Sequence, residues 1–191
     1  YIRHEHACTG DLLRYIKKWE AYLAKHSCEP ADLNSLAWMY LEANVGLSRA
    51  EQLLNDCVRL DPQQEHRPAV IDSMGWLYYR RGDLLQAELS LREALDGLSV
   101  QEAESDYYAV LSHLYFAWRS LKEADLATLA RERVLRWLPR WGIDMLMRKR
   151  VAQNTDGLLV PDGCRYLDGM WLEFFGLRPS GKRPWQLEDV G

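Results

Sequence analysis

The spacing of small and apolar residues along the chain predicts pairs of helices. Between residues 84 and 95 such residues recur three or four positions apart, so they share one face of a helix. The residues on that face are Ala87, Leu91 and Ala94. A preceding helix is predicted at 73–81, and Gly82 supplies the turn between the two. A second pair is predicted within 34–62 on the same grounds, with Ala50, Leu54 and Cys57 on one face.

A short motif recurs along the chain. A small residue followed three positions later by tyrosine occurs at 37–40, 75–78 and 112–115, and an alanine follows each motif. The tyrosines are 38 and 37 residues apart, and the alanines, Ala50, Ala87 and Ala124, are 37 and 37 residues apart. Periods of this length are typical of proteins built from repeated two-helix units, and the difference of one residue indicates a turn of variable length.

The clearest unit carries the pattern Gly75-x-x-Tyr78-x-x-x-Gly82-Asp83-x-x-x-Ala87-x-x-x-Leu91-x-x-Ala94. It resembles the tetratricopeptide repeat (TPR), a helix-turn-helix of about 34 residues. Residues 34–62 resemble a second unit with one extra residue in the turn at 45–47, and residues 106–139 resemble a third. The third unit keeps Ser112, Tyr115 and Ala124, but has Thr128 and Arg131 where apolar and small residues are expected.

The resemblance implies an all-α fold, a right-handed TPR-like solenoid over residues 1–139. Residues 10–27 resemble the second half of a further unit, giving about three and a half units, the first truncated. Half of the twelve glycines and three of the seven prolines lie in the last 41 residues, so residues 140–191 are expected to form an irregular capping segment. Pro161-Asp162-Gly163 predicts a short hairpin there, whereas the spacing of Tyr166, Met170 and Phe174 is compatible with a helix.

The resemblance also implies where a partner protein binds. TPR solenoids bind a peptide or a helix in a concave groove lined by the first helix of each unit. The matching positions predict these partner-binding residues: Asn34, Trp38, Asp72, Trp76, Tyr79, Arg80, His113 and Phe116. Leu41, Glu42 and Ala109 also fall on this face. Trp38 and Trp76 are the expected anchors, and the alternative is that both pack between adjacent first helices or under the C-terminal segment.

One TPR subset binds the C-terminal carboxylate of chaperones with lysine and asparagine, and this chain departs from that pattern. The matching sites carry Ala31, Ser35, Ala69, Ser73, Asp106 and Val110. Asn34 lies one position away, about 100° around the helix. The sequence therefore does not predict this kind of carboxylate binding.

A basic stretch offers an alternative function. Residues 131–150 have seven basic and two acidic residues, with Trp137 and Trp141 among them. Clustered cations with stacking aromatics suit single-stranded nucleic acid or an anionic membrane surface. The simpler interpretation is a solvated helix face that pairs with the acidic residues of 83–106.

Composition and charge narrow the classes of protein to which the chain can belong. The 191 residues are 48% hydrophobic and 27% charged with a net charge of -4, which argues against disorder and a globally basic nucleic-acid binder. Neither an apolar run of about 20 residues nor a signal peptide occurs, so a cytoplasmic protein is expected. The four cysteines are well separated and are expected to be reduced.

We find no sequence motif for catalysis. His4, His6 and Cys8 are close together, but side chains two positions apart on a helix diverge, so a metal site is not expected. No phosphate-binding loop or nucleophile motif occurs, so no catalytic residue, metal, cofactor or small-molecule substrate is predicted. The sequence predicts a non-enzymatic scaffold for protein–protein interaction. The alternative is a regulatory or docking domain cut from a larger enzyme or assembly factor, which the half unit at 10–27 suggests.

Overall fold

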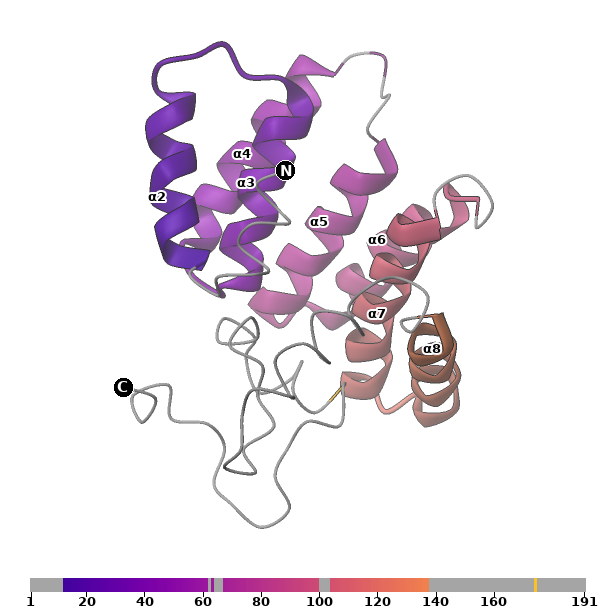
Figure 1. Ribbon diagram of the computed structural model, residues 1–191. Helices are drawn as coiled ribbons and strands as arrows, with labels where there is room; N and C mark the ends of the chain where they lie inside the picture. The colour runs from indigo at the N-terminus through magenta and orange to yellow at the C-terminus, as the bar shows by residue number, and fades with distance from the viewer. Residues whose placement is uncertain (1–11, 62, 64–66, 100–103, 138–173, 175–191) are drawn as a thin grey trace, which may run out of the picture. The chain divides into compact units, whose positions relative to one another are not determined.

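A computed structural model describes residues 12–61, 63, 67–99, 104–137 and 174, and this part of the chain is helical without strands (Figure 1). Its helices are α2 (Leu12–Leu23), α3 (Pro30–Glu42), α4 (Leu47–Leu60), α5 (Arg67–Arg81), α6 (Leu84–Asp96), α7 (Glu104–Ser120) and α8 (Ala124–Trp137). The prediction of an all-α chain is confirmed for these residues. Each helix predicted within the described residues is present, although α5 begins six residues before the predicted 73.

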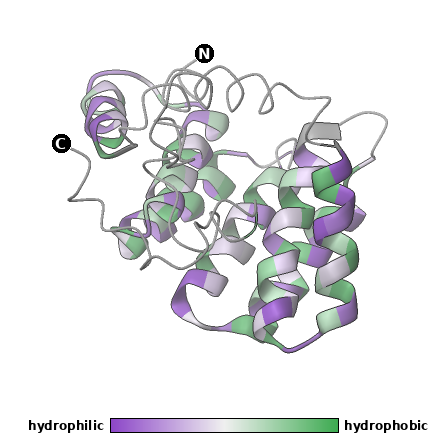
Figure 2. Cartoon of the chain, turned by 60° about the horizontal axis from the view of Figure 1, so that its bottom comes forward, coloured by the Kyte–Doolittle hydropathy of each residue, from purple (hydrophilic) through white to green (hydrophobic). Residues whose placement is uncertain are grey.

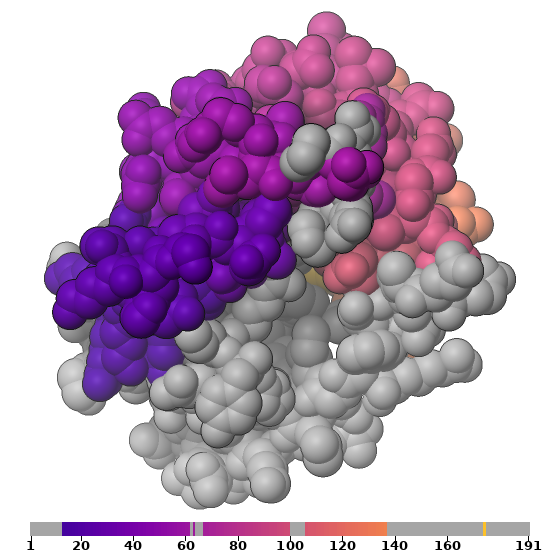
Figure 3. Space-filling model, turned by 90° about the horizontal axis from the view of Figure 1, so that it is seen from above, coloured from indigo at the N-terminus to yellow at the C-terminus, as the bar shows by residue number. Residues whose placement is uncertain are grey.

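The chain divides into two compact units, one of residues 16–136 and one of residues 1–15 with 137–191. Helices α3 to α7 lie wholly in the first unit. Figure 3 is coloured by residue number, and on the face that it shows the colours of this unit follow one another in chain order. Within the second unit, the predicted capping segment 140–191 lies outside the described residues except for Phe174. His4, His6 and Cys8 also lie outside them.

Consecutive helices pack as pairs, and successive first helices also touch. Helix α3 packs against α4 and α5 against α6, while α5 also contacts both α3 and α7. Gly75 permits a close approach of α5 and α6, because a Cβ atom at this position would lie 2.7 Å from Leu91 Cγ on α6. The apolar side of α6 continues into α7 through a buried cluster of Leu91, Ala94, Val110, Leu114 and Ala117. Figure 2 shows hydrophobic and hydrophilic residues interspersed along the described helices, and α3 and α5 bury polar as well as apolar side chains.

The same turn ends the first helix of each pair. Asn44, Gly82 and Lys122 adopt left-handed backbone conformations with φ of 51°, 85° and 67°. Each N–H donates to the carbonyl three residues earlier, and the next N–H donates to the carbonyl of Tyr40, Tyr78 or Trp118, respectively. The extra residue predicted in the turn at 45–47 is present, because α4 is capped by Gly46 whereas Asp83 caps α6 directly after Gly82.

The predicted register of the third unit is wrong. The third turn residue follows the second by 40 positions, so Trp118, not Tyr115, corresponds to Tyr78. The helix α7 has 17 residues against 15 in α5, and Leu121 adds one more before the turn residue Lys122. The alanine of α8 that corresponds to Ala87 is consequently Ala127, which is buried, whereas Ala124 is exposed.

Carboxylates on the second helices hold the next first helix. Glu20 on α2 accepts a hydrogen bond from Tyr40 of α3 at 2.9 Å, and Glu88 on α6 accepts one from Trp118 of α7 at 3.0 Å. Arg49 donates two further bonds to Glu20, which lower the pKa of that carboxyl. The two donors occupy equivalent positions, four residues before the turn residues Asn44 and Lys122, whereas the two carboxylates lie one helical turn apart in position on α2 and α6.

Candidate functional site

Six of the predicted partner-binding residues come together on one side of α5 and α7. Asp72, Trp76 and Arg80 are spaced four apart on α5, so they share a face, and Tyr79 adjoins it. His113 and Phe116 reach the same place from α7. Together with Glu42 of α3, which contacts both His113 and Arg80, we call these residues the first-helix cluster.

Trp76 is the centre of the first-helix cluster. Its ring stacks on His113, with centroids 4.3 Å apart, and on Tyr79, with centroids 4.8 Å apart. The Phe116 ring tilts against it at 5.7 Å. The Arg80 guanidinium lies 4.7 Å from the ring centroid, in a cation–π position, and donates to the Glu42 carbonyl at 3.4 Å. Trp76 thus joins α5 to α7.

The buried side chain of His113 lies between two acidic residues, Asp72 and Glu42. His113 Nδ1 lies 2.7 Å from Asp72 Oδ1, and its Nε2 lies 3.9 Å from Glu42 Oε1, which is an electrostatic contact beyond hydrogen-bond length. Burial disfavours the charged ring, but the charge and hydrogen bond of Asp72, with a smaller contribution from Glu42, outweigh it and raise the pKa of His113 to about 9. At neutral pH, therefore, His113 is an imidazolium between two carboxylates.

The eight predicted partner-binding residues differ in how far their side chains are exposed to solvent. Trp38, Tyr79 and Arg80 are half-buried. The side chains of the others are buried, Trp76 completely so: Asn34, Asp72, Trp76, His113 and Phe116. The position of Trp76 between α5 and α7 matches the packing alternative. The partner-binding role of all eight residues stays a prediction.

Sequence reasoning missed the role of Glu42 in this site. The sequence places Glu42 on the same face of α3 as Trp38 and Asn34, but its contact with His113 spans 71 positions and was not predicted. The side chains of Glu42, Asp72 and His113 do not form a metal site, and the remaining residues that the structure describes contain no such group either. Ser112, next to His113, donates its hydroxyl to the Ala109 carbonyl of its own helix.

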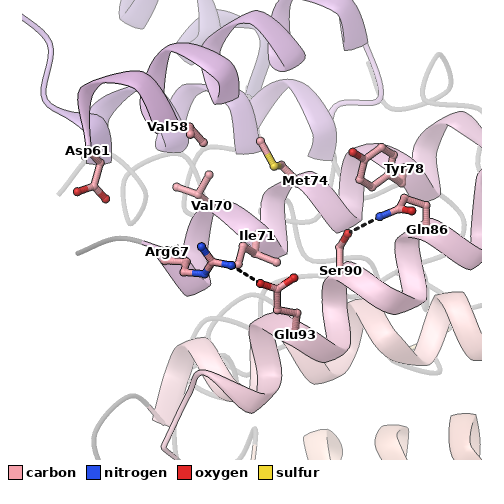
Figure 4. A pocket seen from close by; sticks show the side chains of 10 residues that line it. All are labelled: Val58, Asp61, Arg67, Val70, Ile71, Met74, Tyr78, Gln86, Ser90 and Glu93. Carbon is pink, nitrogen blue, oxygen red and sulfur yellow. Dashed lines mark hydrogen bonds and ion pairs between the residues drawn. The ribbon is translucent and has the colours of Figure 1, made fainter. Parts of the chain in front are cut away.

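A pocket of about 440 Å³ lies between α4, α5 and α6, and we call it the α4–α6 pocket (Figure 4). Its apolar lining consists of Val58, Val70, Ile71 and Met74. Its other lining residues are Asp61, Arg67, Tyr78, Gln86, Ser90 and Glu93. An ion pair joins Arg67 to Glu93 across the pocket from α5 to α6, and Gln86 donates to Ser90 at 3.4 Å.

The predicted basic stretch is only partly described. Residues 138–150 lie outside the described residues, and within α8 Arg136 pairs with Glu132 one turn earlier. Nucleic-acid binding by residues 131–150 therefore stays a prediction. In the part of the chain that the structure describes, no helix is long and apolar enough to cross a membrane.

Comparison with known proteins gives one informative relative. The chain is 33% identical over 86 residues to the TPR repeat-containing protein PA4667 of Pseudomonas aeruginosa. It is similar to part of a TPR protein. The match covers 45% of this chain and 14% of the relative, so the chain corresponds to a small part of that protein's length. No family model matches the chain, and no solved structure matches it significantly.

Proposed function

We propose that this chain is a non-enzymatic protein-interaction module whose TPR-like helix pairs stack as a right-handed solenoid. Its ligand is a peptide or a helix of a partner protein, bound on the face formed by α3, α5 and α7. Three features support this proposal: the recurring helix pair, the contacts between successive first helices, and the similarity to a TPR protein.

The observation that carries the proposal is the first-helix cluster itself. Residues predicted separately from two repeat units meet around Trp76, with Arg80 and Tyr79 at its half-buried edge. Aromatic and arginine side chains of this kind dominate binding energy at protein interfaces. In our proposal Trp38, Tyr79 and Arg80 contact the partner directly. The buried residues Asn34, Asp72, Trp76, His113 and Phe116 hold the surface in shape.

The test is partner capture with matched variants. The chain is used as bait in a cell extract beside Trp38→Ala/Tyr79→Ala, and Tyr22→Ala serves as the control. Tyr22 is an aromatic residue of α2 with 48% of its surface exposed, and it lies outside the first-helix cluster. Loss of an anchor typically weakens binding by about 30-fold, so a partner should be recovered with the chain and the control but not with the double variant. Equal recovery with all three baits would contradict the proposal.

A further inference from the structure

Two acceptor oxygens on α3 lack a hydrogen-bond donor. Among the residues that the structure describes, neither Asn34 Oδ1 nor Glu42 Oε1 has a hydrogen-bond partner, and the two residues are only 5% and 4% exposed. By contrast, the buried residues Ser90 and Ser112 both take part in hydrogen bonds. A buried polar atom without a partner costs free energy, so both oxygens call for a role beyond packing.

Both oxygens belong to one strip of α3. Asn34, Trp38 and Glu42 are spaced four apart, so their side chains share a face of the helix. Trp38 in the middle is half-buried and contacts the partner in the proposed function. A segment bound on Trp38 therefore passes over the residues one turn to either side. Since both oxygens are closed to solvent in the free chain, the side chains that cover them must change rotamer when the segment binds.

The charged groups around Glu42 do not supply the missing hydrogen bond. Arg80 donates to the main-chain carbonyl of Glu42, and His113 is bonded to Asp72 through Nδ1 while its Nε2 stays 3.9 Å from Glu42 Oε1. A cation from the partner could serve this carboxylate, but it would not explain the oxygen of the uncharged Asn34. Backbone N–H groups can serve both.

The spacing of these two residues fits an extended chain. Positions eight apart on a helix are separated by about 12 Å along its axis. Four residues of extended chain span about 13 Å, and alternate N–H groups point to the same side, so the N–H groups of residues four apart face one way. A bound helix does not offer such a pair, because beyond its first turn the backbone N–H groups are bonded within the helix.

We infer that the partner segment is extended and lies along α3, where two of its backbone N–H groups, four residues apart, donate to Asn34 Oδ1 and Glu42 Oε1. This inference rests on the proposed function. It specifies the conformation of the ligand and the two acceptors that recognise its backbone.

The test starts from random nonapeptides displayed on phage and selected on the chain. The tightest peptide is synthesised again with each backbone N–H in turn replaced by an ester oxygen, which removes one donor and keeps every side chain. We expect the affinity to fall about 10-fold at two positions four residues apart, and less at the others. Loss at no such pair of positions would overturn the inference.

Variants of α3 assign the two donors. In Asn34→Leu, one of the two esters should bind as strongly as the parent peptide, and in Glu42→Met the other should. Glu42→Gln keeps an acceptor oxygen and should retain the sensitivity. Ser90→Ala, at a buried but hydrogen-bonded residue of α6, is the control and should behave as the unchanged chain. Equal sensitivity to both esters in Asn34→Leu and in the unchanged chain would overturn the inference.

The stability of Asn34→Leu gives a readout that needs no ligand. Its unfolding temperature should equal or exceed that of the unchanged chain, because no internal hydrogen bond is lost. A lower temperature would show that the oxygen is satisfied in the free chain, and would overturn the inference.

Failure of the inference can be told apart from failure of the proposed function. Selected peptides that Trp38→Ala/Tyr79→Ala no longer binds, but that show no such pair of sensitive positions, would overturn the inference and leave the proposed function supported. Peptides that bind this double variant as strongly as the unchanged chain lie elsewhere and would overturn the inference. Selection of no peptide would overturn it as well, whereas a captured partner protein that the double variant loses would still support the proposed function, with a helix as the ligand.

Discussion

The imidazole of His113 on α7 lies 2.7 Å from the carboxylate of Asp72 on α5, inside the protein and beneath the ring of Trp76. The two residues are 41 positions apart and belong to successive helix pairs. A buried ion pair is costly to leave half-made, because the remaining charge loses its partner. This contact therefore makes the packing of α5 on α7 sensitive to single substitutions and to pH.

The pH dependence of stability follows from the raised pKa of His113. An unfolded histidine has a pKa near 6.5, and in the folded chain the pKa rises to about 9. The folded state thus holds the proton more tightly, so the stabilisation is complete below about pH 6.5 and is lost as the pH rises through 9. Urea unfolding at several pH values should show the free energy of unfolding falling over this window. His113→Gln should flatten that fall, and an unchanged slope in this variant would contradict the assignment.

Asp72→Ala should destabilise the chain strongly. Removing the carboxylate leaves a buried imidazole without its closest partner, and breaking a buried pair in this way costs about 3 to 5 kcal/mol. Chemical denaturation measures the loss. The double variant Asp72→Ala/His113→Ala should lose less than the sum of the two single variants, since each single change leaves the other group unpaired. Additive losses would show that the two side chains do not interact.

Gly75→Ala should separate α5 from α6. The added Cβ atom would lie 2.7 Å from Leu91 Cγ and 3.2 Å from the Leu91 backbone nitrogen, so a helix backbone must shift. Overpacking of this kind typically costs about 1 to 3 kcal/mol. Gly97→Ala is the control, because its nearest neighbour would lie at an ordinary 3.4 Å and its φ is negative. Equal thermal unfolding temperatures for the two variants would count against the close helix approach.

Lys122→Gly should stabilise the chain. Lysine at φ 67° bears the steric cost of a left-handed backbone, about 1 to 2 kcal/mol, and glycine does not. Glycine loses more entropy on folding, so we expect a net gain of about 1 kcal/mol in the free energy of unfolding. Gly82→Ala, at the same place in the preceding turn, should have the opposite effect. Destabilisation by Lys122→Gly would contradict the equivalence of the two turns.

The sequence predicted a helix pair accurately where the residue in the turn is a glycine, which is typical of a left-handed backbone. Gly82 and its neighbours identify the turn of the middle unit, but a lysine in the same conformation at position 122 gives no such indication. The motif at 112–115 matches the earlier motifs in residue type but not in its position relative to the turn. The predicted alignment of the third unit was therefore wrong by three residues. Periodicity shows which residues share a helix face. It does not show what packs on that face, which is why the complete burial of Trp76 and the contact of Glu42 with His113 had to come from the structure.

The central claim, that the face of α3, α5 and α7 contacts a partner protein, is tested most directly by photo-cross-linking. Benzoylphenylalanine is placed at Trp38 or Tyr79, which are half-buried, and at Tyr22 of α2 as the control. After irradiation in cell extract, our account predicts one cross-linked protein shared by positions 38 and 79 and absent at 22. A partner protein cross-linked only at position 22, or no cross-linked protein at positions 38 and 79 of the folded chain, would contradict it.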